Sequence, residues 1–182
     1  MSKILKPRER SNSSNATMKR IKSQILSSRN HRDVLNIVAR CTVPLNSACS
    51  CAAFHQLAKY CDSVASIHQI KKDQVWESLL KDCCSGLGEQ DVRGICKVWW
   101  SFNKLGVSYQ IENSVADQPL NESAVLLASA LDRTTAIAPE LDAMGVANCL
   151  WGIAKAFGDQ TSLSTERCDL CSFALKVFNC LH

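Results

Sequence analysis

Glycine and proline are scarce in this chain, with seven and four among 182 residues. It also lacks runs of alternating β-branched residues bounded by turn residues, which is the pattern of a half-buried strand. A β-sheet is therefore disfavoured, and the sequence predicts an all-α protein. The length fits one domain that is large enough to bury about 70% of its unfolded surface.

Long apolar runs are missing as well. Although 46% of the residues are hydrophobic, no stretch approaches the roughly 18 consecutive apolar residues that a membrane-spanning helix needs. Residues 1–20 have no apolar core of a secretory signal. An oxidising compartment, where the eleven cysteines would form disulfides, therefore has no support, and we expect no membrane partner.

The signatures of common enzyme classes do not occur. The chain has no Walker loop, no dinucleotide-binding glycine pattern and no His-x-x-x-His pair. The histidines are scattered, and a cysteine nucleophile would need a partner histidine that the sequence does not place. The four histidines are His31, His55, His68 and His182. We therefore predict a protein that is not an enzyme, with no cofactor and no small-molecule substrate.

Close cysteine pairs are few. They are Cys49 with Cys51, Cys83 with Cys84, and Cys168 with Cys171. A structural zinc site usually brings two close pairs together, so we favour cysteine as a small buried residue in packed helices. The alternative is a metal site supplied by Cys168, Cys171 and His182.

Positive charge is concentrated at the N-terminal end. Residues 1–40 hold ten Lys or Arg residues and two acidic ones, a net charge of +8, whereas the remaining residues carry −4. Such a basic segment is typical of proteins that contact polyanions, because each cation placed at a phosphate releases condensed counterions. The alternatives are a solvated tail and an organelle-targeting peptide. We predict RNA contacts from Lys3, Lys6, Arg8, Arg10, Lys19, Arg20, Lys22, Arg29 and Arg32.

One helical pattern occurs three times. The segments are NSACSCAAFHQLAKYC from Asn46, DVRGICKVWWSFNKLG from Asp91 and DAMGVANCLWGIAKAF from Asp142. The first residue of each can cap a helix by accepting a hydrogen bond from a free backbone N–H. Thirteen residues later comes a cation, favoured at a helix C-terminus by the helix dipole. These cations are Lys59, Lys104 and Lys155.

Helices of a second type are predicted between and after these three. They cover residues 31–41, 73–84, 122–133 and 164–181. Alternation of two helix types at spacings of 45 and 51 residues between the lysines predicts an α-solenoid of about three to four stacked helix pairs. We divide the chain into a basic extended arm, residues 1–16, and a helical-repeat domain, residues 17–182, which opens with a short basic helix from Thr17.

Each helix of the repeated type has an apolar stripe that we expect to face the core. In the second and third copies it comprises Ile95, Val98, Trp99 and Phe102, and Val146, Cys149, Leu150 and Ile153. Trp100 and Trp151 occupy a neighbouring register, beside small or short residues. We expect both indoles to pack against an adjacent helix, with base stacking as the alternative.

The opposite stripe of each copy is polar and variable. It contains the residues eleven, seven and three positions before the lysine, and the lysine itself. We expect it to be a free surface, with Gln56, Ser101 and Gly152 at the third of these positions. It can contact phosphates and base edges, or be an ordinary solvated face. The predicted RNA contacts are Lys59, Arg93, Lys97, Lys104, Asn148 and Lys155.

The three repeated segments resemble the octotricopeptide-type repeats, and the related helical repeats that precede RAP domains in FAST-kinase-like proteins of organelles. The repeated helix of that family reads approximately x-x-x-L-A-N-x-L-W-A-x-A-K-L-G, and the resemblance covers about residues 20–160. In the first copy the matching residues are Asn46, Ala53, Phe54, His55, Leu57, Ala58 and Lys59. The resemblance implies organellar RNA binding, in RNA maturation, translation or ribosome assembly.

Together these features predict a non-catalytic RNA-binding helical-repeat protein. The chain has a basic arm, is small and contains no recognisable RAP domain. For these reasons we expect an rRNA-contacting structural component of a mitochondrial ribosome, bound to neighbouring ribonucleoprotein subunits. The alternatives are a plastid location, a free organellar factor for RNA maturation or translation, and a protein-binding adaptor solenoid.

Overall fold

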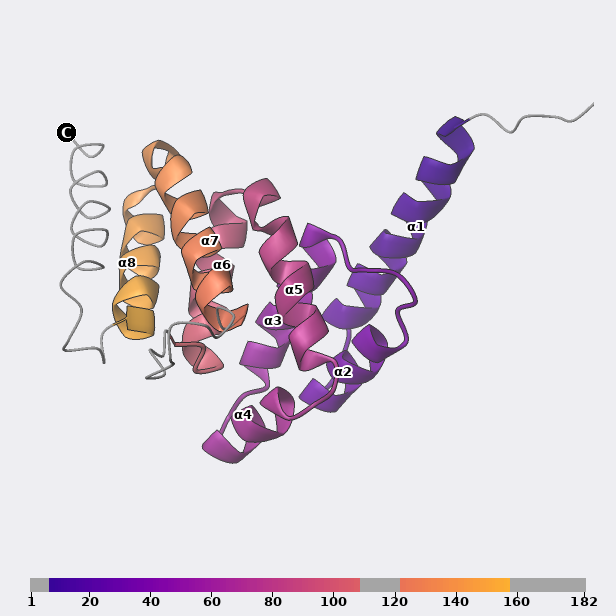
Figure 1. Ribbon diagram of the computed structural model, residues 1–182, viewed down its shortest axis with the longest axis horizontal. Coiled ribbons are helices and arrows are strands. Elements are labelled where there is room, and N and C mark those ends of the chain that lie inside the picture. The colour runs from indigo at the N-terminus through magenta and orange to yellow at the C-terminus, as the bar shows by residue number, and fades with distance from the viewer. Residues whose placement is uncertain (1–6, 109–121, 158–182) are drawn as a thin grey trace, which may run out of the picture.

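The computed structural model describes residues 7–108 and 122–157 (Figure 1). Within these ranges all regular elements are helical, which confirms the predicted all-α class. The α-helices are α1 (Pro7–Leu26), α2 (His31–Ala39), α3 (Ser47–Lys59), α4 (Val64–Lys71), α5 (Trp76–Gly86), α6 (Val92–Lys104), α7 (Glu122–Ala136) and α8 (Ala143–Phe157). Two short 3-10 turns, η1 (Leu87–Glu89) and η2 (Ala138–Glu140), precede α6 and α8.

The predicted capping residues begin the three repeated helices. Asn46 Oδ1 accepts a hydrogen bond from the N–H of Cys49 at 3.0 Å. The equivalent bonds from the N–H of Gly94 to Asp91 Oδ1 and from the N–H of Gly145 to Asp142 Oδ1 are both 2.7 Å long. Each satisfies an N–H group that the first turn of a helix leaves without an intrahelical partner.

The lysines and one glycine mark the ends of these helices. Lys59 and Lys104 are the last residues of α3 and α6, and Lys155 lies in the last turn of α8. Gly106 has a φ of 60°, a conformation that glycine adopts without the steric cost of a Cβ atom, and it follows the end of α6.

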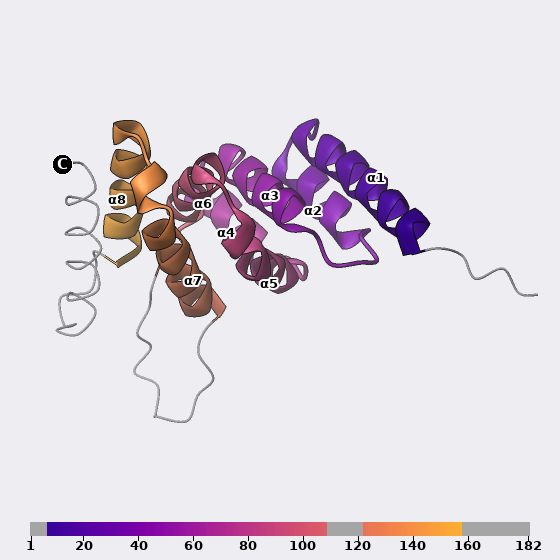
Figure 2. The same cartoon turned by 90° about the horizontal axis from the view of Figure 1, so that it is seen from above.

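All α-helices that the structure describes, apart from α4, form two rows (Figure 2). One row contains α1, α3, α6 and α8, and its consecutive members contact one another. The other contains α2, α5 and α7, of which α5 and α7 are in contact. Contacts of α3 with α2 and α5, and of α6 with α7, join the two rows. The three repeated helices therefore lie side by side in the same row, after α1.

Aromatic side chains join the two rows in the core. The ring of Phe54 on α3 lies 5.4 Å from that of Trp76 on α5 and 5.9 Å from that of Phe102 on α6. Trp99, fully buried on α6, packs edge-on against Phe102 at 5.8 Å. Its Nε1–H donates to Thr134 Oγ1 on α7 at 2.8 Å, so the indole both fills the core and bonds across it.

The apolar stripes are buried as predicted, except at Leu150. The side chain of Leu150 on α8 is 37% exposed, whereas Val146, Cys149 and Ile153 are buried. In the described part of the chain α8 is the last helix of its row and contacts α6 on one side. The prediction for Leu150 is therefore wrong, because this residue lies outside the α6 contact.

The polar stripe is not a free surface along its whole length. Gln56, Ser101 and Gly152 are all buried. Gln56 Nε2 donates to the Leu26 carbonyl at the end of α1, at 2.8 Å. A Cβ atom added to Gly152 would lie 2.7 Å from Cβ of Trp99, so α8 closely approaches α6 at a residue without a side chain. The prediction that this position is exposed is wrong, because it lies where consecutive helices of the row meet.

Two further helices differ from the predicted pattern. α1 begins at Pro7 rather than Thr17, so residues 7–16 are helical and the predicted extended arm is wrong over that range. The C-terminal half of α1 packs on the core through Met18, Ile21 and Ile25. A helix nucleated there extends towards its N-terminus at little cost.

The unpredicted α4 starts with a capping box formed by Ser63 and Ser66. Residues 1–6 and the predicted helix 164–181 lie outside the described residues.

Candidate nucleic-acid interface

A basic groove runs over α3 between α1 and α6, with a volume of about 590 Å³. We call it the α3 groove. Small residues of α3, Ala48 and Ala52, line it together with the cations Lys22 of α1 and Arg93 and Lys97 of α6. Three predicted RNA contacts from two different helices therefore lie around one hollow.

The repeat register explains this arrangement. Arg93 and Lys97 occupy on α6 the positions that Ala48 and Ala52 occupy on α3, eleven and seven residues before the helix-ending lysine. Because α3 carries methyl groups where α6 carries long cations, the surface is low over α3 and high over α6. The side chains of Lys22, Arg93 and Lys97 are all exposed and can move to meet an anion.

The α3 groove also contains acidic residues, one of which caps α6. Glu89 and Asp91 both line the groove. Oδ1 of Asp91 accepts the capping bond from the N–H of Gly94 at 2.7 Å, which uses part of its hydrogen-bonding capacity. The cations Lys22, Arg93 and Lys97 thus outnumber the two acids around the hollow, and the resulting field attracts anionic ligands.

An aromatic pair extends from the α3 groove. His55 of α3 lines the groove, and its ring lies 5.1 Å from that of Trp100 on α6, with a tilt of 57°. Both residues stand four positions before the lysine of their helix, and both are half-buried. The prediction that Trp100 packs on an adjacent helix is confirmed. Trp151, at the same position of α8, is 48% exposed in the described part of the chain.

The His55 ring is held in its neutral form. Burial lowers the pKa of His55 below the ordinary value of 6.5, and the positive charges of Lys97 and Lys59 lower it further. Its Nδ1 atom is buried and has no hydrogen-bond partner among the described residues. Protonation would therefore place a third charge between two cations without a bond to stabilise it.

This environment predicts a loss of stability in acid. Because the folded-state pKa of His55 is below 6.5, the unfolded chain binds more protons than the folded one in the interval below that value. The contribution of neutral His55 is present above pH 6.5 and is lost as the pH falls through the folded-state pKa. We expect urea midpoints of wild type to fall more between pH 7.5 and 5 than those of His55→Phe, which keeps a ring against Trp100. Equal falls in both proteins would contradict this role.

The other predicted contacts are dispersed over the surface. Arg20 and Arg29 line a second hollow, between α1 and α2. Exposed residues that line neither hollow are Lys19, Arg32, Lys59, Lys104, Asn148 and Lys155. Arg8 and Arg10 belong to α1, but their side chains are not described, and Lys3 and Lys6 lie outside the described residues. The second hollow also contains Arg40, Gln24 and Asn36, which the sequence analysis did not select.

Cysteines in the described ranges have free thiols. Cys49, Cys51, Cys83 and Cys149 are buried, as expected for cysteine used as a small core residue. Across the described ranges, groups of three or more His, Cys, Asp or Glu residues close enough to hold a metal ion are absent. The proposed alternative ligands Cys168, Cys171 and His182 lie outside those ranges.

The described helices include none that is both long enough and apolar enough to span a bilayer.

Comparison of the chain with protein-family models, with curated proteins and with solved structures finds no match.

Proposed function

We propose that this chain is a non-catalytic RNA-binding α-solenoid whose α1–α3–α6 surface binds single-stranded RNA. The observation that carries the proposal is the meeting of Lys22, Arg93 and Lys97 around the small-residue floor of α3. Two helices supply the cations and a third supplies the space between them. A backbone phosphate that enters the α3 groove meets cations from both sides.

Single-stranded RNA suits this surface better than a duplex. Proteins read single strands by stacking unpaired bases on aromatic rings beside a basic groove. The half-buried His55–Trp100 pair offers such rings at the edge of the α3 groove. The positive charge of Lys97 lies close enough to His55 to lower the pKa of its ring. A base that stacks on this pair therefore leaves its own phosphate near Lys97.

The repeated register supports the solenoid description and a structural role. Each helix of the row presents a similar set of positions, so an RNA strand crossing the row meets related side chains in turn. We further propose that the protein is a structural component of an organellar ribonucleoprotein, specifically an rRNA-contacting component of a mitochondrial ribosome. That part of the proposal depends on the family resemblance and on the charge of +8 in residues 1–40.

An adaptor function is the second candidate, favoured by the exposed apolar side chains of α8. Met144 is 70% exposed and Trp151 48% exposed in the described part of the chain.

Binding of the full-length chain to a fluorescent decamer of uridine, followed by anisotropy at physiological salt, distinguishes the two functions. We expect a dissociation constant of about 10⁻⁶ M or tighter, at or beyond the strong end of non-specific nucleic-acid binding. Lack of binding up to 10⁻⁴ M, roughly the weak end of that range, would favour the adaptor.

A further inference from the structure

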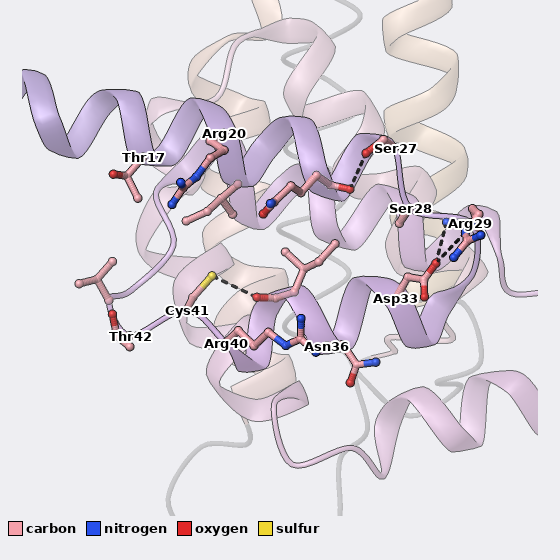
Figure 3. A pocket seen from close by; sticks show the side chains of 14 residues that line it. Thr17, Arg20, Ser27, Ser28, Arg29, Asp33, Asn36, Arg40, Cys41 and Thr42 are labelled. Atoms are coloured by element: carbon pink, nitrogen blue, oxygen red, sulfur yellow. Dashed lines mark hydrogen bonds and ion pairs between the residues drawn. The ribbon is translucent and has the colours of Figure 1, made fainter.

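The second hollow lies between α1 and α2 and has a volume of about 650 Å³ (Figure 3). We call it the α1–α2 groove. Sites for small ligands occupy roughly 300 to 1,000 Å³, so one nucleotide fits this space. The groove belongs to the opposite side of α1 from the α3 groove, and the two share no lining residue.

Its walls combine an apolar floor with two amides. Ile21 of α1 and Ile37 of α2 supply the apolar contact. Ile21 belongs to the hydrophobic core, and Ile37 packs against that core. Gln24 of α1 and Asn36 of α2 flank them with exposed side-chain amides. An amide offers both a donor and an acceptor, which the edge of a nucleobase requires, whereas aliphatic side chains suit its flat face.

Two arginines stand on opposite sides of the α1–α2 groove. Figure 3 shows Arg20 on α1 and Arg40 directly after α2. Both side chains are exposed, and neither guanidinium has an ion-pair or hydrogen-bond partner among the side chains that the structure describes. Guanidinium groups bind phosphate through paired hydrogen bonds, so these two can hold an anion at the mouth of the groove.

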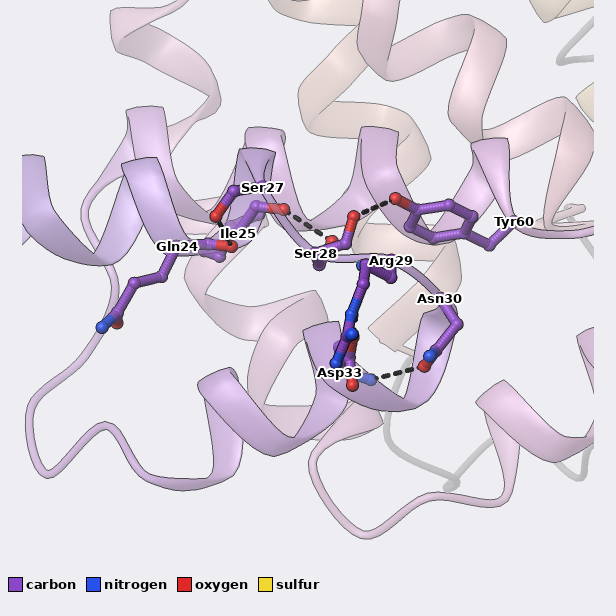
Figure 4. A network of polar contacts seen from close by, with 8 residues as sticks. All are labelled: Gln24, Ile25, Ser27, Ser28, Arg29, Asn30, Asp33 and Tyr60. Atoms are coloured by element: carbon purple, nitrogen blue, oxygen red, sulfur yellow. Dashed lines mark hydrogen bonds and ion pairs between the residues drawn. The ribbon is translucent and has the colours of Figure 1, made fainter.

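A hydrogen-bonded turn closes one end of the groove and fixes α1 against α2 (Figure 4). Ser28 Oγ donates to the Ile25 carbonyl at 2.7 Å, and the Tyr60 hydroxyl, from the end of α3, donates to the Ser28 carbonyl. Asn30 Oδ1 accepts from the N–H of Asp33 at 2.9 Å and so caps α2. The space between the helices is therefore formed before any ligand binds.

The same turn also engages Asp33, which is the one acidic residue that lines the α1–α2 groove. Asp33 Oδ2 accepts a hydrogen bond from the N–H of Arg29 at 3.2 Å and lies 3.6 Å from Arg29 Nε. Asp33 and Arg29 thus neutralise each other at the closed end. Arg20 and Arg40 are left as net positive charge at the open part of the groove.

We propose that the α1–α2 groove binds one nucleotide of a single-stranded RNA chain. The base lies on Ile21 and Ile37, with its edge at Gln24 and Asn36. The adjoining phosphates bind Arg20 and Arg40. This inference rests on the proposed RNA-binding function and assigns a nucleotide site to a part of the surface separate from the α3 groove.

The test uses the full chain and a fluorescent decamer of uridine at physiological salt. We expect Arg20→Ala and Arg40→Ala each to weaken binding about tenfold, the loss of one charge-assisted hydrogen-bonding group. Lys72→Ala removes an exposed cation outside both hollows and should change the affinity less than about twofold. A decamer containing 4-thiouridine should form photo-crosslinks with α2, which lines the α1–α2 groove and not the α3 groove, and Gln24→Leu with Asn36→Leu should reduce their yield.

The possible outcomes distinguish failure of this site from failure of the proposed function. If Arg93 and Lys97 variants lose RNA but the Arg20 and Arg40 variants bind as wild type, the nucleotide site is wrong and the proposed function stands. If free uridine monophosphate competes at the concentration at which the decamer does, the site serves free nucleotides, which overturns its assignment to an RNA chain. If the wild-type chain binds no decamer, both proposals fail.

Discussion

Replacement of Trp99 by alanine is expected to lower the free energy of unfolding by about 3 to 5 kcal/mol, the usual range for a buried tryptophan. Its side chain has no exposed surface, packs edge-on against Phe102 and bonds to Thr134 across the two rows. The substitution removes all three contributions and leaves a cavity between α6 and α7. Urea unfolding monitored by circular dichroism measures the change.

Trp151 provides the matched control, because it has the same side chain in the equivalent helix, one register position further along. It is 48% exposed in the described part of the chain. Trp151→Ala should cost about 1 kcal/mol or less, near the range for surface substitutions. Similar costs for the two alanine variants would contradict the assignment of the Trp99 position, rather than the Trp151 position, to the core.

Charge reversal in the α3 groove should have the largest effect on RNA binding. We expect the double variant Arg93→Glu with Lys97→Glu to weaken binding of a uridine decamer about a hundredfold, since each lost charge-assisted contact is worth about 1.5 to 3 kcal/mol. Both side chains are exposed, so the helical fold should persist. Circular dichroism on the same samples checks that point.

The control for this variant carries the same change in net charge. Lys72→Glu with Lys81→Glu reverses two exposed cations that line neither hollow and are not among the predicted RNA contacts. Its effect should stay within about threefold, because separated surface charges are screened over about 8 Å at physiological salt. Equal losses in the two double variants would mean that net charge, and not the α3 groove, determines binding.

The sequence was sufficient to predict the helices that depend on local chemistry. Asn46, Asp91 and Asp142 act through side chains and backbone groups only three residues away. The apolar stripes follow from the helical period, and all of their members but Leu150 are buried. These features need no knowledge of which helix lies beside which.

The parts that could not be predicted depend on neighbours in the row. Gln56 is a polar residue that looks exposed in a helical projection, yet its amide bonds to the end of α1. Gly152 is buried because α8 closely approaches Trp99. Helical periodicity tells which side of a helix is apolar, but it does not tell where two helices of one row touch.

The two hollows illustrate the same difference. The charge of residues 1–40 predicts Lys22 as a contact, and the polar stripe predicts Arg93 and Lys97, but the sequence gives no reason to place Lys22 beside the other two. Arg40 lies in the basic N-terminal region, but the sequence gives no reason to assign it an RNA contact. Nothing in the sequence distinguishes Gln24 and Asn36 from other polar residues. Only the contact of α1 with α2 places them around one space.

If cations around the α3 groove bind the phosphates of an RNA strand, the affinity of the full chain for a uridine decamer must depend on salt. It can be measured from 50 to 300 mM salt. Each phosphate contact on a single strand contributes about −0.7 to the slope of log K against log salt. We expect a slope of about −2 or steeper, which becomes shallower by more than about one unit when Arg93 and Lys97 are replaced by alanine. A flat response, or a slope unchanged by those substitutions, would contradict it.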